Sequence, residues 1–162
     1  MSRHRDAARA MAGECLCFRA RRLSRVLTRL YDDALRPLGV QATQLMLLNA
    51  IAMSDEGGVA MHVLADFLAM DRTTLSRNVR PLERAGWVRV ARSPADGRAR
   101  LLLLTPAGRR LVEAAAPLWR QAHDRVLAVL GAEAAAELRG RLDAALAVGG
   151  VGAGARPGGG VD

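Results

Sequence analysis

The sequence predicts a mainly α-helical protein that carries one small β-hairpin, and three observations support this fold class. Alanine, leucine and arginine are strong helix formers and abundant, while aromatic residues make up only 3% of the chain. Apolar residues recur at spacings of three and four in several long segments. One segment, around ARSPADGRAR (91–100), instead follows an alternating apolar pattern and contains a Pro-Asp-Gly turn, which is typical of a hairpin.

Length and charge limit the class of protein. The 162 residues suffice for a single domain with an adequate core. The net charge is +8 and all 24 basic residues are arginines, so a polyanionic partner is the first expectation. No segment resembles a signal peptide or reaches the roughly 18 apolar residues of a membrane span, so we expect a cytoplasmic protein. Two cysteines are too few for a disulfide framework.

The N-terminal part predicts a basic arm followed by a long helix. Residues 1–12 are expected to form a loose arm, and a helix is expected from Glu14 to Leu35, where Pro37 and Gly39 end it. Its apolar seam consists of Leu16, Ala20, Leu23, Leu27, Leu30 and Ala34. Such a seam fits two alternatives, an interface with a second chain and a core seam within one chain.

Four short elements are predicted between this helix and the hairpin. A second helix spans residues 41–53, a very short strand spans 59–60, and a short amphipathic helix spans 61–70. Asp71 then caps a further helix, because an N-cap aspartate accepts hydrogen bonds from amides of the first turn. That helix is expected to end at Gly86, since glycine tolerates the left-handed conformation that follows many helices.

Two helices are predicted after the hairpin. Thr105 is the expected N-cap of a long helix that reaches about Leu130, although Pro117 should kink or interrupt it. A last helix spans residues 132–147. The Gly-rich segment 148–162 cannot bury enough apolar surface to order itself, so we expect a disordered tail.

The helix that follows Asp71 has two contrasting faces. Leu75, Val79 and Leu82 form an apolar stripe, which is expected to pack on a core. The opposite face and its flanks carry Thr73, Thr74, Ser76, Arg77, Arg80 and Arg84. This face suits the major groove of DNA, because arginine can bridge two acceptors of guanine and hydroxyls bond phosphates. The alternative is an ordinary polar face in a chain whose only cation is arginine. Pro81, inside this helix, is expected to bend the C-terminal end of the helix.

The hairpin carries the arginines Arg89, Arg92, Arg98 and Arg100. Two short helices followed by a basic hairpin predict a winged helix-turn-helix. The two elements complement each other, because an arginine of the wing can enter the narrow minor groove beside the major groove that the helix occupies. We therefore expect double-stranded DNA as the partner.

The segment DRTTLSRNVRPLERAGWVRVARSPADGRARLLLLTPAG (71–108) resembles the MarR family of bacterial winged-helix transcription regulators. The positions that match the family pattern are Asp71, Thr73, Thr74, Ser76, Arg77, Leu82, Glu83, Gly86, Val88, Asp96, Arg98, Leu104, Thr105 and Gly108. Pro81 departs from the commonest form of this helix.

The resemblance implies a domain of residues 1–147 that forms a homodimer through helices at about 14–36 and 105–147. It also implies that the lobe of residues 40–104 binds a pseudo-palindromic operator, as a repressor. In such a wing, Asp96 would pair with an arginine to shape the tip, and Arg98 would contact the minor groove.

The resemblance further implies a signal that releases DNA. Many MarR-like repressors release DNA when a small phenolic or lipophilic compound binds between the dimerisation helices and the DNA-binding lobe, and others respond to cysteine oxidation. Tyr31, Met46 and Trp119 lie in the segments that would line such a crevice, although residues of these types usually belong to the core. Cys15 and Cys17 would point about 200° apart on a helix, which disfavours a disulfide between them. Small buried hydrophobic side chains are the favoured interpretation of both cysteines, with a redox switch as the alternative.

Enzyme chemistry is not expected. The sequence has no P-loop, no paired-carboxylate or Ser-His-Asp signature, and no cofactor site, since GGVGAG lies in the tail without a flanking strand and helix. His4, His62 and His123 lack metal-ligand spacing, so no metal site is expected. A second function class remains open, a winged-helix module that binds protein without specific DNA binding.

Overall fold

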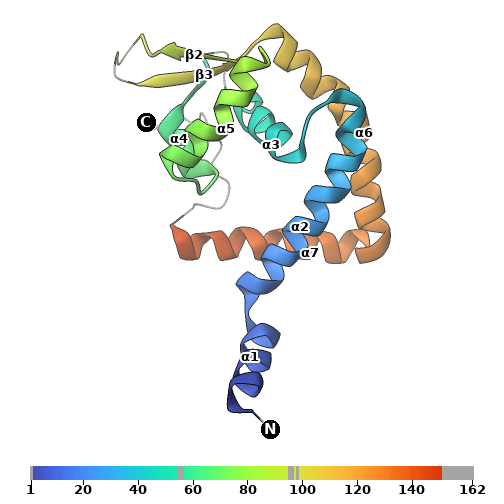
Figure 1. Ribbon diagram of the computed structural model, residues 1–162. Helices are drawn as coiled ribbons and strands as arrows, with labels where there is room; N and C mark the ends of the chain where they lie inside the picture. Colours follow the sequence, from blue (N-terminus) through green and yellow to red (C-terminus); the bar gives the residue numbers. More distant parts are fainter. Residues whose placement is uncertain (1, 55–56, 95–96, 98, 151–162) are drawn as a thin grey trace.

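The computed structural model describes residues 2–54, 57–94, 97 and 99–150, and within them the chain is mainly helical with one small sheet, as predicted (Figure 1). The helices are α1 (Arg3–Glu14), α2 (Leu16–Leu35), η1 (Arg36–Leu38), α3 (Ala42–Ala52), α4 (Met61–Phe67), α5 (Arg72–Arg84), α6 (Pro106–Leu130), α7 (Ala132–Leu146) and η2 (Ala147–Gly149). The strands are β1 (Val59–Ala60), β2 (Val88–Arg92) and β3 (Arg100–Leu104).

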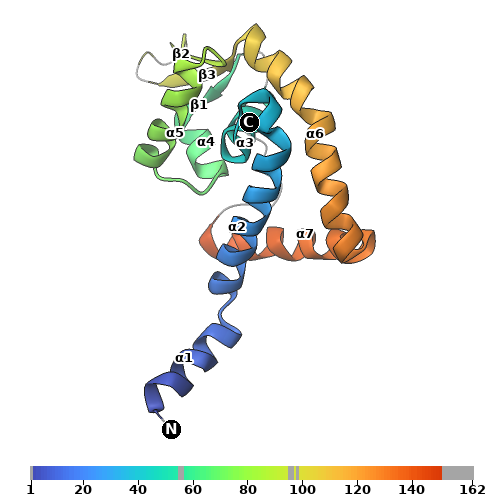
Figure 2. The ribbon, with the colours of Figure 1, turned by 45° about the vertical axis from the view of Figure 1, so that its right-hand side comes forward.

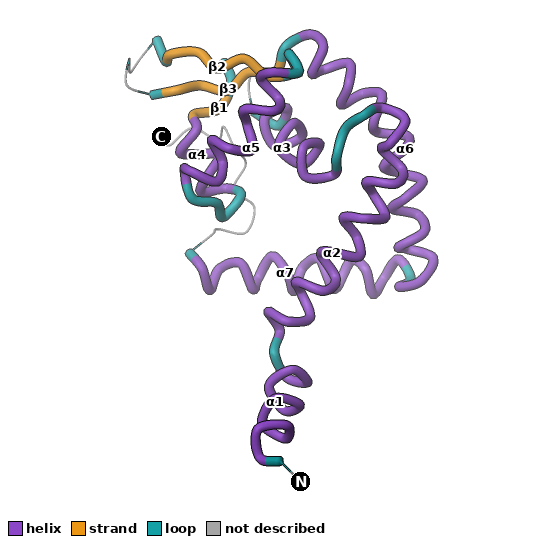
Figure 3. The backbone as a smooth tube through the Cα atoms, viewed as in Figure 1, coloured by secondary structure: helices purple, strands orange, loops and turns teal. Residues whose placement is uncertain are grey.

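The elements form a compact lobe and a frame of long helices. The lobe contains α3, α4, α5 and the sheet, and Figure 3 shows the strands gathered at its outer end. The frame consists of α2 and α6, which pack on each other and on α3, and of α7, which packs on the end of α6 (Figure 2). The lobe is the predicted winged helix-turn-helix, with the long helices outside it.

The sheet is antiparallel, and β3 lies between β1 and β2. Leu102 of β3 pairs with Val59 on one side and with Val90 on the other. The predicted hairpin and the predicted two-residue strand are therefore both confirmed, and they belong to one sheet. Alternation places Val88, Val90 and Leu102 on the same face, where Leu102 is fully buried against the helices.

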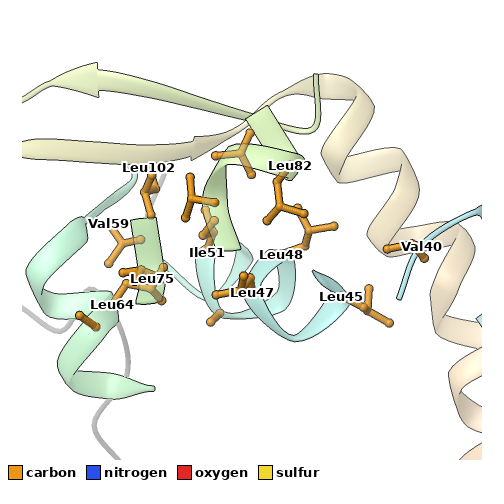
Figure 4. Packing of buried hydrophobic residues seen from close by; sticks show 14 of the residues in the cluster. Val40, Leu45, Leu47, Leu48, Ile51, Val59, Leu64, Leu75, Leu82 and Leu102 are labelled. Atoms are coloured by element: carbon orange, nitrogen blue, oxygen red, sulfur yellow. The ribbon is translucent and has the colours of Figure 1, made fainter. Parts of the chain in front are cut away.

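The core lies inside the lobe, between the sheet and three helices (Figure 4). Its members include Leu45, Leu47, Leu48 and Ile51 of α3, Leu64 of α4, Leu75, Val79 and Leu82 of α5, and Val59 and Leu102 of the sheet. Each fully buried leucine contributes about 1.5–3 kcal/mol relative to an exposed one. No polar or charged side chain among the described residues is buried, so every described arginine lies at the surface.

The N-terminal arm, predicted to be loose, is a helix, and the helix predicted from residue 14 is broken at Cys15. α1 forms because its alanines and arginines favour helix without any buried contact. Cys15 adopts an extended conformation, with φ −68° and ψ 111°. Its Sγ accepts a hydrogen bond from the Phe18 amide at 3.4 Å, while the Arg19 guanidinium donates to the Gly13 carbonyl at 2.6 Å. These contacts satisfy backbone groups at the break, and α2 begins after it as a separate helix.

Two prolines lie inside helices that continue through them. α5 continues past Pro81 to its predicted end before Gly86, where φ is +72°. α6 is not interrupted at Pro117, so of the two predicted effects, a kink or an interruption, the interruption does not occur. Ala115 and Ala122 are almost fully buried on either side of that proline, so packing holds both flanking turns in place. η2 ends close to the described boundary, and residues 151–162 of the predicted tail lie outside the described residues.

The start of α6 is joined to the end of α5 by a close backbone contact, which we call the junction (Gly86, Trp87, Thr105 and Gly108). The Thr105 hydroxyl donates to the Gly86 carbonyl at 2.6 Å and accepts from the Gly108 amide at 3.1 Å, as the predicted N-cap. Gly108 is buried, and a Cβ there would collide with the Trp87 carbonyl. Glycine is therefore required at this position for space and not for an unusual φ.

We expect Gly108→Ala to lower the free energy of unfolding by about 1–3 kcal/mol, the usual cost of forcing an extra carbon into a packed site. The matched control is Gly140→Ala in α7, where a Cβ would meet nothing within 4 Å. This control should raise stability by about 0.5–1 kcal/mol, because alanine favours helix. Urea unfolding followed by circular dichroism measures both changes. Equal effects of the two substitutions would contradict a close contact at the junction.

Candidate nucleic-acid interface

α5 places its predicted polar face at the surface of the lobe. Leu75, Val79 and Leu82 are at most 2% exposed and pack inward. The predicted contact residues Thr73, Thr74, Arg77, Arg80 and Arg84 are exposed, and Ser76 is half-buried beside them. The structure therefore brings together all six of the predicted residues that lie on this helix.

The three arginines of this face, which we call the basic row (Arg77, Arg80 and Arg84), line an open hollow of about 450 Å³ with Glu83. Their spacing of three and four places them along one side of the helix. None of them forms an ion pair with a carboxylate in the described part of the chain. Their positive charge is thus left available to an external anion.

The N-terminal end of α5 is capped by Asp71, as predicted. Its Oδ1 accepts from the Thr74 amide at 2.8 Å, and its Oδ2 accepts from the Thr74 hydroxyl at 2.6 Å. The hydroxyl proton of Thr74 is therefore used inside the cap, and this side chain can offer a phosphate no donor of its own. Thr73 and Ser76 remain the hydroxyl candidates. The hydrogen bonds from Thr74 also lower the pKa of the Asp71 carboxyl.

The wing continues the basic surface beside α5, which packs on β2. Arg92 and Arg100 are exposed and lie directly opposite each other in the strand register. Like charges at opposed positions destabilise a hairpin. An anion bound beside this pair would relieve the repulsion, so the pair favours anion binding at this surface. The predicted wing residues Asp96 and Arg98 lie outside the described residues.

A cavity of about 360 Å³ separates the lobe from the frame, and we call it the interlobe cavity. Its lining comprises Tyr31 and Leu35 of α2, Ala42, Leu45, Met46, Asn49 and Ala50 of α3, Met53 after α3, Phe67 and Leu68 at α4, and Trp119 of α6. Tyr31, Met46 and Trp119, which sequence patterns nominated from three distant segments, thus meet at one cavity. Met46 and Trp119 are 41% and 37% exposed, so they are not ordinary core.

His123, which the sequence did not point to, contacts two of the aromatic residues that line this cavity. Its Nδ1 lies 3.0 Å from the Tyr31 hydroxyl, and its ring stacks on Trp119 with centroids 4.7 Å apart. The only sequence signal was its position four residues after Trp119, which places both on one face of α6. Burial raises the pKa of the Tyr31 phenol, which therefore remains protonated at neutral pH.

Cys15 and Cys17 lie on the far side of the frame from the basic row. Both thiols are exposed, so their favoured interpretation as buried hydrophobic side chains was wrong. They are exposed because α1 and the first turns of α2 extend beyond the other helices (Figure 1). Cys15 is not helical, so the geometry that disfavoured a pair with Cys17 does not hold for it.

Two further searches concern the described residues. No helix there is long and apolar enough to cross a membrane. In the same residues, His, Cys, Asp and Glu form no group of three that could hold a metal ion.

Comparison with known proteins gives consistent matches. The sequence model described as MarR family matches residues 38–99. The transcriptional regulator MosR from M. tuberculosis, solved in complex with DNA, is 37% identical with a TM-score of 0.71, and the match covers 83% of this chain and 98% of that chain. A mutant of MarR from E. coli, complexed with operator DNA, is 25% identical with a TM-score of 0.74, over 84% of this chain and 97% of that chain.

One further likeness concerns the fold alone. CouR from Rhodococcus jostii RHA1, solved with bound p-coumaroyl-CoA, is 24% identical with a TM-score of 0.69, over 81% of this chain and 91% of that chain. No curated protein matches the chain.

We expect Asp71→Ala to lower the melting temperature at pH 7 and to have a smaller effect in acid. Because folding lowers the pKa of this carboxyl below its ordinary 3.8, its stabilisation is present above that value and is lost as the pH falls through the folded pKa. Thermal melts from pH 7 to pH 3 measure the difference between the variant and the wild type. Asp71→Asn, which keeps a capping oxygen without the charge, is the control. A difference that does not change with pH would contradict the charged cap.

Proposed function

Because the chain belongs to the MarR family of DNA-binding transcriptional regulators, we propose that it represses its target genes as a homodimer on a pseudo-palindromic operator. One observation carries this function: the basic row is exposed, pairs with no described carboxylate, and lies on a helix beside the wing. The MosR and MarR structures with DNA support DNA as the partner.

In the proposed complex, α5 enters the major groove. Arg77 and Arg80 contact base edges or phosphates, and the hydroxyls of Thr73 and Ser76 bond phosphates near the N-terminal end of the helix. The wing follows the backbone toward the minor groove, where Arg92 and Arg100 meet the negative potential of the DNA. The two basic elements thus contact adjacent grooves.

Exposed apolar side chains on the frame support the homodimer. Large ones lie on α2, α6 and α7: Leu16, Phe18, Leu23, Val26, Val129, Leu130, Leu142 and Leu146. An apolar surface of this extent is unusual on a monomer. We propose that the seam of α2 serves both of its predicted alternatives: Leu27 and Leu30 are half-buried within the chain, while Leu16 and Leu23 are exposed and would face a second chain. A two-fold dimer of such chains requires an operator with matching symmetry.

Two signals are proposed to release the DNA. A small phenolic or lipophilic compound in the interlobe cavity would change how the lobe sits on α2 and α6, since the cavity wall comes from both parts. Oxidation of Cys15 would act at the other end of α2, because its thiol is both exposed and the N-cap of that helix. A thiolate attacks one oxygen of hydrogen peroxide, the O–O bond breaks as the S–O bond forms, and the products are a sulfenic acid and a hydroxide ion that takes up a proton from the solvent to become water.

We further propose that the protein has no catalytic activity and requires no cofactor. A winged-helix module that binds protein is the alternative function. It would need no basic row, and the DNA experiment below distinguishes it.

We expect Arg77→Ala to weaken binding to an operator duplex, obtained by selection from random duplexes, by about 1–3 kcal/mol, or roughly five- to 150-fold in Kd. The reason is the loss of a groove contact. The control Arg120→Ala removes the same charge from an exposed position of α6 and should change Kd less than twofold. Fluorescence anisotropy over a salt series measures both, and the wild type should show a steep loss of affinity with salt.

Selected duplexes without a palindrome, or equal losses in the two variants, would contradict specific recognition by α5. The same samples should sediment as a dimer of 17.3 kDa chains. Absence of DNA binding at low salt would move the protein-binding module to first place.

We expect hydrogen peroxide to weaken operator binding of the wild type at least fivefold and to leave Cys15→Ser nearly unchanged. The serine cannot be oxidised and keeps a side-chain acceptor at the start of α2. Cys17→Ser, two residues further on, is the matched control and should still respond. Anisotropy before and after peroxide, followed by reduction, measures the change. Release from Cys15→Ser equal to the wild type would exclude this thiol as the sensor.

A further inference from the structure

The interlobe cavity carries an inference about the charge of its ligand, which rests on the effector role proposed above. Its wall is aromatic and apolar, with Phe67, Trp119 and Met46 among its largest side chains. The Tyr31 hydroxyl and the Asn49 carboxamide supply its polar groups. None of the lining residues carries a charge.

The helix end nearest the cavity offers few amides to an anion. α3 begins at Ala42, which lines the cavity, and free amides at such a helix end would favour a carboxylate. The Ala42 amide, however, already donates to Asp32 Oδ1 at 2.7 Å, in a part-buried contact. The Gln41 amide donates to Gln44 Oε1 at 2.9 Å, and the Gln41 side chain in return accepts from the backbone of Gln44. The amides of Gln41, Ala42 and Gln44 are thus satisfied within the protein.

Asp32 also places a carboxylate beside the cavity. Its side chain lies beside a lining residue, so a negative group borders the cavity on the α2 side. A ligand carboxylate placed there would lose its hydration, meet this negative charge, and find no cation on the wall to pair with. An uncharged ligand meets none of these costs.

The aromatic side of the cavity favours a flat ligand. The rings of Tyr31, Trp119 and His123 are nearly parallel, with interplanar angles of 8° and 12° between successive rings. The Tyr31 hydroxyl is held by His123 at 3.0 Å, so the ring has a fixed position on the wall. A planar aromatic ligand can extend such a stack with a favourable offset geometry. A volume of about 360 Å³ accommodates a compound of two fused rings.

From these contacts we infer that the interlobe cavity selects uncharged planar aromatic compounds and rejects the carboxylates of the same shape. Asn49 is the group that orients the ligand, since it lines the cavity and a carboxamide can both donate and accept hydrogen bonds.

The test compares 2-naphthamide with 2-naphthoate at pH 7.5, two probes of one shape that differ in charge. Isothermal titration of the wild-type protein is expected to give a Kd for the amide at least about tenfold lower than for the carboxylate. Release of a labelled operator duplex should follow the same order. Asn49→Leu is expected to weaken the binding of 2-naphthamide by about fivefold and to leave the affinity for the operator unchanged.

A matched pair of variants tests whether the preference for the amide arises at the wall of the interlobe cavity. Met46→Arg places a guanidinium on the cavity wall at a position 41% exposed, and it should narrow or reverse the preference for the amide. Thr43→Arg adds the same charge on α3 at an exposed position outside the lining, and it should leave the preference unchanged. Retained operator binding shows that each variant is folded.

The outcomes separate this inference from the effector role. Equal affinity for the two probes, or a preference for the carboxylate, overturns the selection for neutral ligands and leaves the cavity as an effector site. A preference that Met46→Arg does not alter assigns the ligand to another site and overturns the inference. No binding of either probe by protein that still binds its operator overturns the effector role of the cavity itself.

Discussion

The junction between α5 and α6 is the contact on which the arrangement of the two parts of the molecule depends. The Thr105 hydroxyl holds the Gly86 carbonyl while the backbone of Gly108 lies directly on that of Trp87. The start of α6 therefore lies directly beside the end of α5, although the hairpin of β2 and β3 separates the two helices in the chain. Movement of α6 is transmitted to the lobe at this point, because neither backbone can shift without breaking the cap or the close contact.

The lobe was predictable from sequence because its signals are local. Asp71 and Gly86 mark the two ends of α5, and the alternation around Val88 and Val90 marks the hairpin. These residues affect only the backbone within a few positions of themselves, so the local sequence is enough to predict the structure that they cause. The same holds for the exposed face of α5, which follows from its 3.6-residue period once the apolar stripe is recognised.

The parts that sequence did not predict depend on distant contacts or on their absence. At the interlobe cavity, the Tyr31 hydroxyl contacts His123, which is 92 positions away, and no local pattern connects the two residues. Cys15 looked like a helical position because its neighbours favour helix on both sides. Its thiol and the guanidinium of Arg19 instead satisfy backbone groups at the break. Pro117 was expected to kink or interrupt α6, but the helix continues because burial of Ala115 and Ala122 outweighs the hydrogen bond that the proline removes.

The absence of lysine has a consequence for the control of the basic row. A guanidinium cannot lose its proton in water, and it is not a substrate for acetylation. The charge that Arg77, Arg80 and Arg84 present is therefore constant over any pH in which a cell survives. Cytoplasmic acidification and lysine acylation, two common ways of weakening a protein's hold on a polyanion, have no target on this surface. Control of its occupancy is left to geometry, which in the proposed homodimer is the distance and angle between the two copies of α5.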